Sequence, residues 1–232
     1  MADQSVSVGA GLAWSWSRFR AAPWTLIGAA ALWAVVLIAA MLVISSVVAI
    51  PAAFLATDET SPGAEAGLLA LLTVFAIPVL ALAASCWFNG IIALADRHTA
   101  AVGEFFVPRA YLPTLAVTAI VYVVSTCSQI LFTIIAPLPW VDFLVAAAIS
   151  VAAMWMYFYA VDVRASAATS ISRGLTLTAR RLAPTLITVA LCWVMLLAGV
   201  ALLGIGVLVA VPVSSLLALY YFRALTGRPL AA

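Results

Sequence analysis

Six apolar stretches, each long enough to cross a lipid bilayer as a helix, occupy most of this sequence of 232 residues. A hydrocarbon core about 30 Å thick needs roughly 20 apolar residues in helical conformation. The spans that we predict lie at about residues 24–50, 67–94, 114–135, 143–161, 185–203 and 207–222. Because lipid cannot hydrogen-bond to an open backbone, this pattern predicts an all-α polytopic bundle of six transmembrane helices.

The last two spans are predicted from a single uncharged stretch at residues 184–222. Such a stretch is too long for one crossing and suits two crossings joined by a tight turn. Gly204 and Gly206 lie where the chain has to reverse, and glycine tolerates the positive φ that a tight turn requires. An even number of crossings places both ends of the chain on one side of the membrane.

The composition excludes a soluble domain. Hydrophobic residues make up 67% of the chain and charged residues 8%, whereas soluble domains are about 45–50% apolar and about 25% charged. The stretches between the spans are also shorter than the ~50 residues of an independent domain. We therefore expect one membrane domain over residues 1–232, with a cytoplasmic segment at 1–22 and a cytoplasmic tail at 223–232.

The charges are distributed unequally between the two sides of the predicted bundle. All ten basic residues are arginines, and all of them lie on the same side as the two ends of the chain. The opposite side carries only acidic residues, which are Asp58, Glu59, Glu65 and Asp142. Because basic residues are enriched in cytoplasmic loops, the arginine side is predicted to face the cytoplasm. The lysine-free, alanine-rich composition is typical of a GC-rich bacterial genome, so we expect a multi-pass protein of the bacterial cytoplasmic (inner) membrane.

A short pattern of arginine, proline and Thr-Leu precedes three of the spans, with its prolines at Pro23, Pro113 and Pro184. Proline is tolerated in the first turn of a helix, where its missing N–H has no intrahelical partner. The pattern predicts three similar units, each an interfacial helix followed by a transmembrane hairpin. Chance similarity among alanine- and leucine-rich segments is the alternative explanation.

The clearest of the interfacial segments covers residues 165–181. On a helix, the spacing of Ala168, Ile171, Leu175 and Thr178 places these side chains on one face. The arginines of the same segment can then reach water or phosphate. The segment is therefore predicted to form an amphipathic helix at the membrane surface.

The last third of the chain carries a distinctive set of residues around its predicted helix ends. The set comprises Ala168, Ile171, Arg173-Gly174-Leu175 and Leu177, then Gly204 and Gly206, then Pro212 and Tyr220-Tyr221-Phe222-Arg223. It resembles a group of bacterial six-span membrane proteins that includes the membrane domain attached to some glycerophosphoryl diester phosphodiesterases. The resemblance implies the fold alone, because the loops of this chain are too short to hold the phosphodiesterase catalytic domain.

A few polar residues near the span ends are candidates for chemistry. Asp96, Arg97 and His98 bring together an acid, a base and the single histidine of the chain. A proton-handling or headgroup site is one interpretation, but we favour a loop in which Asp96 caps the next helix and Arg97 meets phosphate. Asp162, at the end of a span, is expected to pair with Arg164 or to cap a helix.

The third span contains the densest polar cluster, which includes Ser125, Ser128 and Gln129. Together with Ser45 of the first span, these side chains would line a small polar cavity of the kind that a transporter uses. Helix packing is the favoured explanation, because small hydroxylated residues let helices approach and hydrogen-bond to each other. Asn89 is likewise expected to hydrogen-bond between helices. Other serines at a similar depth would line the same outward-facing cavity if they converge there, and these are Ser46, Ser150, Ser214 and Ser215.

The sequence lacks nucleotide-binding, hydrolase and metalloprotease motifs, and its cysteines and histidine show no metal-ligand spacing. We therefore expect no enzymatic activity, no metal and no cofactor. The favoured function is a scaffold or accessory subunit that contacts anionic lipid or a partner protein, and nucleic acid is not expected because the arginines form no single stripe. The candidate contact residues are Arg18, Arg20, Arg97, Arg109, Arg164, Arg173, Arg180 and Arg181. The alternative is a small transporter or exporter of an uncharged or lipid-like solute that uses the third-span cluster.

Overall fold

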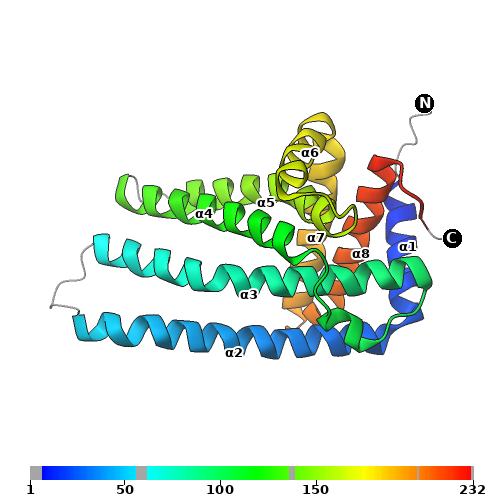
Figure 1. Ribbon diagram of the computed structural model, residues 1–232. Helices are drawn as coiled ribbons and strands as arrows, with labels where there is room; N and C mark the ends of the chain where they lie inside the picture. The colour runs from blue at the N-terminus through cyan, green and yellow to red at the C-terminus, as the bar shows by residue number, and fades with distance from the viewer. Residues whose placement is uncertain (1–6, 56–61, 136–138, 203, 231–232) are drawn as a thin grey trace.

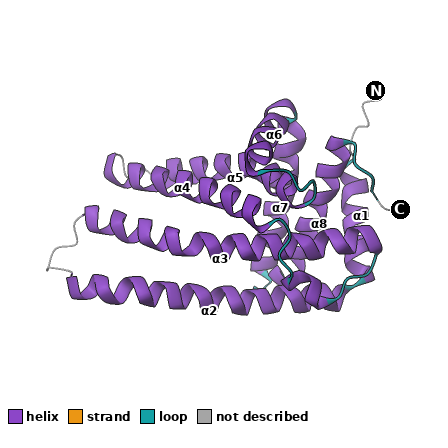
Figure 2. Ribbon diagram, in the orientation of Figure 1, coloured by secondary structure: helices purple, strands orange, loops and turns teal. Residues whose placement is uncertain are grey.

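The computed structural model describes residues 7–55, 62–135, 139–202 and 204–230, and the chain is helical throughout these ranges except for short loops (Figure 2). No strand occurs among them, which confirms the all-α prediction. The helices are α1 (Val8–Ala21), α2 (Pro23–Leu55), α3 (Pro62–Arg97), the 3-10 helix η1 (Val102–Phe106), α4 (Tyr111–Ile135), α5 (Pro139–Val161), α6 (Ala167–Arg180), α7 (Leu182–Ala201) and α8 (Val207–Thr226).

Six of these helices are long and apolar enough to cross a membrane, as the hydrophobic pattern predicts. They are α2, α3, α4, α5, α7 and α8. Their ends extend past several predicted spans, because a helix can continue after it leaves the hydrocarbon layer. α8 runs to Thr226, four residues beyond the predicted end, and stops at Gly227, which adopts φ 69° as a left-handed C-terminal cap.

The long helices α2, α3 and α4 lie side by side, with α3 between the other two (Figure 1). α2 begins, α3 ends, α4 begins and α5 ends at one end of this array, which is called here the arginine-rich end. Of the four acids predicted on the opposite side, Glu65 lies near the start of α3 and Asp142 near the start of α5. Both positions are at the opposite end of the array, as predicted, while Asp58 and Glu59 lie outside the described residues.

Proline and glycine act at the helix ends as predicted. Pro23 is the first residue of α2, and Pro113 and Pro184 are the third residues of α4 and α7, so all three lie in a first turn. Gly204 adopts φ 77° between α7 and α8. Below this turn Gly199 touches Gly206, and a Cβ atom on Gly199 would lie 2.9 Å from the carbonyl carbon of Gly206.

The three predicted units are not equivalent. α1 and α6 are helices of 14 residues each, whereas the corresponding segment of the middle unit forms only the five-residue η1. Pro108 follows η1 closely and restricts the residue before it to extended conformations, which prevents a longer helix there. All three units contain a helical hairpin, but only the first and the third also contain a preceding helix of 14 residues.

Of the four residues that the spacing places on the apolar face of α6, only Thr178 is buried against the protein. Ser170, Gly174 and Thr178 are buried against α5, and a Cβ atom on Gly174 would lie 2.6 Å from Cγ of Met156. Thr178 therefore belongs to the packing face, whereas Leu175, predicted beside it, is 46% exposed. The described protein leaves this apolar side of α6 uncovered, as expected of a helix at a membrane surface.

α8 is the most buried helix and runs across α2 and α3 near the arginine-rich end (Figure 1). Its aromatic residues form the core together with α5: the rings of Phe222 and Phe158 stack at 5.3 Å between centroids, and Trp155 lies 6.0 Å from Phe222. Trp155 and Phe222 are fully buried. This crossing brings the C-terminal end of α8 to the ends of α3 and α5.

Candidate functional site at the arginine-rich end

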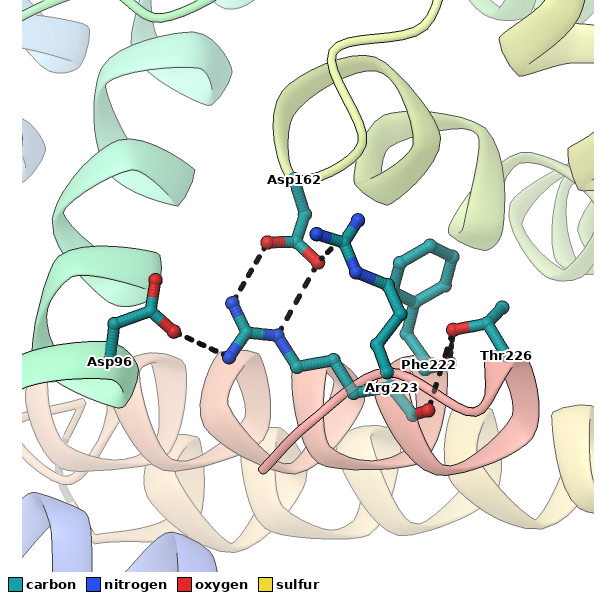
Figure 3. A network of polar contacts seen from close by, with 6 residues as sticks. Asp96, Asp162, Phe222, Arg223 and Thr226 are labelled. Atoms are coloured by element: carbon teal, nitrogen blue, oxygen red, sulfur yellow. Dashed lines mark hydrogen bonds and ion pairs between the residues drawn. The ribbon is translucent and has the colours of Figure 1, made fainter. Parts of the chain in front are cut away.

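Charged residues from three helices meet where α3, α5 and α8 end (Figure 3). Asp96 lies in the last turn of α3, Asp162 directly follows α5, and Arg223 lies in the last turn of α8. Arg228 reaches the same cluster from the segment after α8. The cluster joins residues that are separated by more than sixty positions in the sequence.

Arg223 is the centre of the cluster. Its Nη1 donates to Oδ1 of Asp96 at 2.6 Å, and its Nη2 donates to Oδ1 of Asp162 at 2.9 Å. Nε of Arg223 and Nη1 of Arg228 lie 3.4 and 3.2 Å from Oδ2 of Asp162. The side chains of Arg223 and Asp162 are 5% and 2% exposed, so each charge requires the other to offset its loss of hydration.

Two local predictions for these acids are wrong. Asp162 pairs with Arg223 and Arg228, not with Arg164 two residues away. Asp96 binds Arg223 and does not cap the following segment. In both cases the partner comes from α8, because the buried guanidinium of Arg223 needs acceptors and both carboxylates lie within its reach.

Other polar residues of the site bind the loop after α3. Nη2 of Arg97 lies 2.5 Å from Oε1 of Glu104, while the contact of Arg97 with phosphate stays a prediction. Asn89 donates to the backbone oxygen of Glu104 at 3.0 Å, so its partner is η1 and not another long helix. Arg18 donates to Nδ1 of His98 and lies over the ring of Trp14. These contacts assign Asn89, Arg97 and His98 to packing of the loop.

The structure thus separates the arginines into two groups. Arg18, Arg97, Arg223 and Arg228 contact other residues of the chain. Within the described ranges, five arginines have no carboxylate within 4.0 Å, and these are Arg20, Arg109, Arg164, Arg173 and Arg180. All of them except the half-buried Arg109 are exposed, and Arg181 is exposed as well.

Arg109 and Arg164 lie in strained loops. Arg164 itself adopts φ 55°, and Ala110, directly after Arg109, adopts φ 54°. A left-handed conformation at a residue other than glycine costs about 1–3 kcal/mol and tends to occur at functional sites. Burial lowers the pKa of the Arg109 guanidinium below its ordinary value, and the nearby charge of Arg164 lowers it further, whereas Asp162 and Asp96 oppose the shift.

The predicted third-span cavity residues do not converge with Ser45. Ser45 lies on α2 and the cluster lies on α4, with α3 between them (Figure 1). Ser128 donates to the backbone oxygen of Ser125 at 2.8 Å, and Thr126 hydrogen-bonds to Thr73 of α3 at 2.8 Å. These contacts are those of helix packing. Ser45 lines a groove of about 330 Å³ whose other residues are Leu37, Ile38, Met41 and Leu42.

A different set of serines meets in a shallow, open cavity of about 250 Å³ between α3, α5, α7 and α8. Ser150, Ser214 and Ser215 contribute to its wall together with Cys192 and Tyr157. The sequence places these serines at a similar depth, but which of them meet depends on the tertiary packing of α5 and α8. Ser215 also accepts a hydrogen bond from Nε1 of Trp87 at 3.0 Å.

No protein-family model, curated protein or solved structure matches this chain. The resemblance to the phosphodiesterase-associated membrane domains therefore stays a prediction from the residues that carry it. The functional proposal depends on the charges and surfaces described above.

Proposed function

We propose that this protein is a non-enzymatic scaffold or accessory subunit of the bacterial cytoplasmic membrane, which contacts anionic lipid or a partner protein through its arginine-rich end. The observation that carries the proposal is the group of exposed arginines without internal counter-ions. Arg173 and Arg180 lie on α6, whose Leu175 side is uncovered, and Arg20 lies at the end of α1. An amphipathic helix with exposed arginines suits the headgroup region of a bilayer.

A lipid-dependent stability measurement tests this proposal. Each arginine near an anionic surface contributes about 1 kcal/mol, so Arg20, Arg173 and Arg180 together contribute about 3 kcal/mol. We expect the protein to unfold at a higher temperature in phosphatidylglycerol nanodiscs than in phosphatidylcholine nanodiscs, with a smaller difference at high salt. The triple variant Arg20→Gln, Arg173→Gln, Arg180→Gln should lose most of this difference. The proposal fails if the triple variant retains the full difference, and Arg97→Gln, at an arginine already paired with Glu104, is the control.

We also propose that the two ends of the chain are cytoplasmic and that the segments joining α2 to α3, α4 to α5 and α7 to α8 face outward. Single cysteines at Thr60, Trp140 and Ile205 should react with a membrane-impermeant maleimide in intact cells. A cysteine at the exposed Ser172 of α6 should react only after permeabilisation. Native Cys86, Cys127 and Cys192 must first be replaced by serine. Because α8 runs across α2 and α3, Ile205 is the most informative position, and its protection would show that the α7–α8 hairpin does not cross.

The cavity that contains Ser150, Ser214 and Ser215 favours a second candidate, a carrier for a small uncharged solute. Its position differs from the third-span cluster that the sequence suggests. Replacing Ser214 by Leu would fill the cavity, and a carrier would then lose uptake of its solute in proteoliposomes. A scaffold would retain its lipid preference in the same variant, which distinguishes the two functions.

A further inference from the structure

Two arginines at the arginine-rich end, Arg109 and Arg164, have no carboxylate of the described chain within 4.0 Å. α4 and α5 pack against each other as an antiparallel hairpin, so the start of α4 and the end of α5 lie at the same end (Figure 1). Arg109 comes two residues before α4, and Arg164 comes three residues after α5. Burial is the main cause of the lowered pKa of Arg109, and the charge of Arg164 lowers this pKa further.

The nearby carboxylates are already occupied. Asp162 binds Arg223 and Arg228, and Asp96 binds Arg223 (Figure 3). That cluster contains two acids and two arginines, so it has no formal charge left to neutralise a third guanidinium. Arg109 and Arg164 therefore leave a local excess of positive charge.

The guanidinium of Arg109 also has an unused donor. Its Nε is buried, and no hydrogen-bond acceptor reaches it from the part of the chain that the structure describes. A buried donor of this kind is costly unless it meets an acceptor, and an anion supplies one. Arginine binds phosphate through two parallel N–H donors, which gives both charge and geometry.

We propose that Arg109 and Arg164 form a specific binding site for the phosphate group of an anionic lipid. The inference rests on the proposed lipid-contacting function and narrows it to one site among the exposed arginines. The hydrophobic neighbours of Arg109 favour a lipid over free phosphate. Val107 is 56% exposed and Leu112 is 73% exposed, so each offers an apolar surface to an acyl chain beside the phosphate.

Native mass spectrometry of the purified full chain in mild detergent tests the site. The probes are dioctanoyl phosphatidic acid, dioctanoyl phosphatidylcholine and inorganic phosphate. We expect saturable binding of one phosphatidic acid per chain, with weaker binding of phosphatidylcholine. Arg109→Gln and Arg164→Gln should each weaken this binding about tenfold, because a hydrogen bond to a charged group is lost. Arg97→Gln, which removes the same charge from an arginine already paired with Glu104, should leave it unchanged.

The variant Arg109→Lys distinguishes a bidentate phosphate-binding site from a general positive surface. Lysine keeps the charge but not the two parallel donors, so a specific site loses most of its affinity in this variant. The proposal is overturned if Arg109→Gln and Arg97→Gln have equal effects, or if Arg109→Lys binds as the parent protein does. Competition by inorganic phosphate at equal concentration would identify a soluble phosphate and overturn the lipid assignment.

Failure of the Arg109 and Arg164 site can be distinguished from failure of the proposed lipid-contacting function. The nanodisc experiment above changes Arg20, Arg173 and Arg180 and leaves the two arginines of this site intact. If the nanodisc preference falls in that triple variant while Arg109→Gln has no effect on phosphatidic acid binding, only the specific site is overturned. Thermal unfolding of the Arg109→Gln variant serves as the folding control and should match the parent protein.

Discussion

Replacing Arg223 by alanine should reduce the free energy of unfolding by about 3 kcal/mol, because it leaves a buried carboxylate without its main partner. Asp162 is 2% exposed and would retain only Arg228, whose side chain is 34% exposed. The contact between Arg223 and Asp96 contributes less, since the side chain of Asp96 is 49% exposed and can be hydrated by water. Unfolding of the purified protein by sodium dodecyl sulfate in mixed micelles measures the loss.

The double variant Arg223→Leu, Asp162→Leu should recover at least half of that loss, because no charge is then left buried at the ends of α5 and α8. Arg97→Ala is the matched control. Its ion pair with Glu104 is partly exposed, with side-chain exposures of 58% and 29%, so its removal should cost less than about 1 kcal/mol. Equal losses for Arg223→Ala and Arg97→Ala would refute the idea that the buried cluster fixes α8 in place.

The second large effect is expected at Gly90 of α3, where the ring of Phe105 lies against the backbone. A Cβ atom on Gly90 would lie 2.3 Å from Cδ1 and 2.4 Å from Cγ of that ring. The ring cannot move away easily, because Phe105 is fully buried, packs on Trp87 at 5.3 Å between centroids, and accepts a hydrogen bond from Trp33 through its backbone oxygen. Gly90→Ala should therefore destabilise the protein by about 1–3 kcal/mol in the same unfolding assay.

Gly28 of α2 provides the matched control, since a Cβ atom there meets nothing within 4 Å. Gly28→Ala should be neutral or stabilising by up to about 1 kcal/mol, because alanine favours the helix. Adding Phe105→Ala to Gly90→Ala should cost less than the sum of the two single changes, since the smaller side chain removes the clash. If the two losses are additive, the destabilisation by Gly90→Ala does not come from a clash with the Phe105 ring.

Much of the fold follows from local rules that the sequence displays directly. The apolar lengths predict all six long helices, the prolines predict where α2, α4 and α7 begin, and Gly204 predicts the reversal between α7 and α8. Each of these features depends on residues that are close together in the chain. The structure of the middle interfacial segment does not follow from such local rules. Its short 3-10 helix η1 depends on how Phe105 is buried against α3.

The candidate site was predictable only in its composition. The sequence shows that arginines gather on one side, but it cannot separate Arg223, which is 4% exposed, from Arg173, which is exposed. Local spacing pairs Asp162 with Arg164, whereas the structure pairs it with Arg223. The serines that share a cavity likewise come from helices far apart in sequence.

The sequence by itself determined that this chain is a membrane protein of six long apolar helices with its arginines at one end. That result is physically local, because helix length and backbone hydrogen bonding are settled within each segment. Only the tertiary structure decided that α8 is the buried helix and that Arg223 neutralises two acids while Arg109 and Arg164 have no counter-ion within the described chain. An apolar helix that packs against protein and one that faces lipid have the same composition, so the pairing of charges at their ends depends on which helices meet.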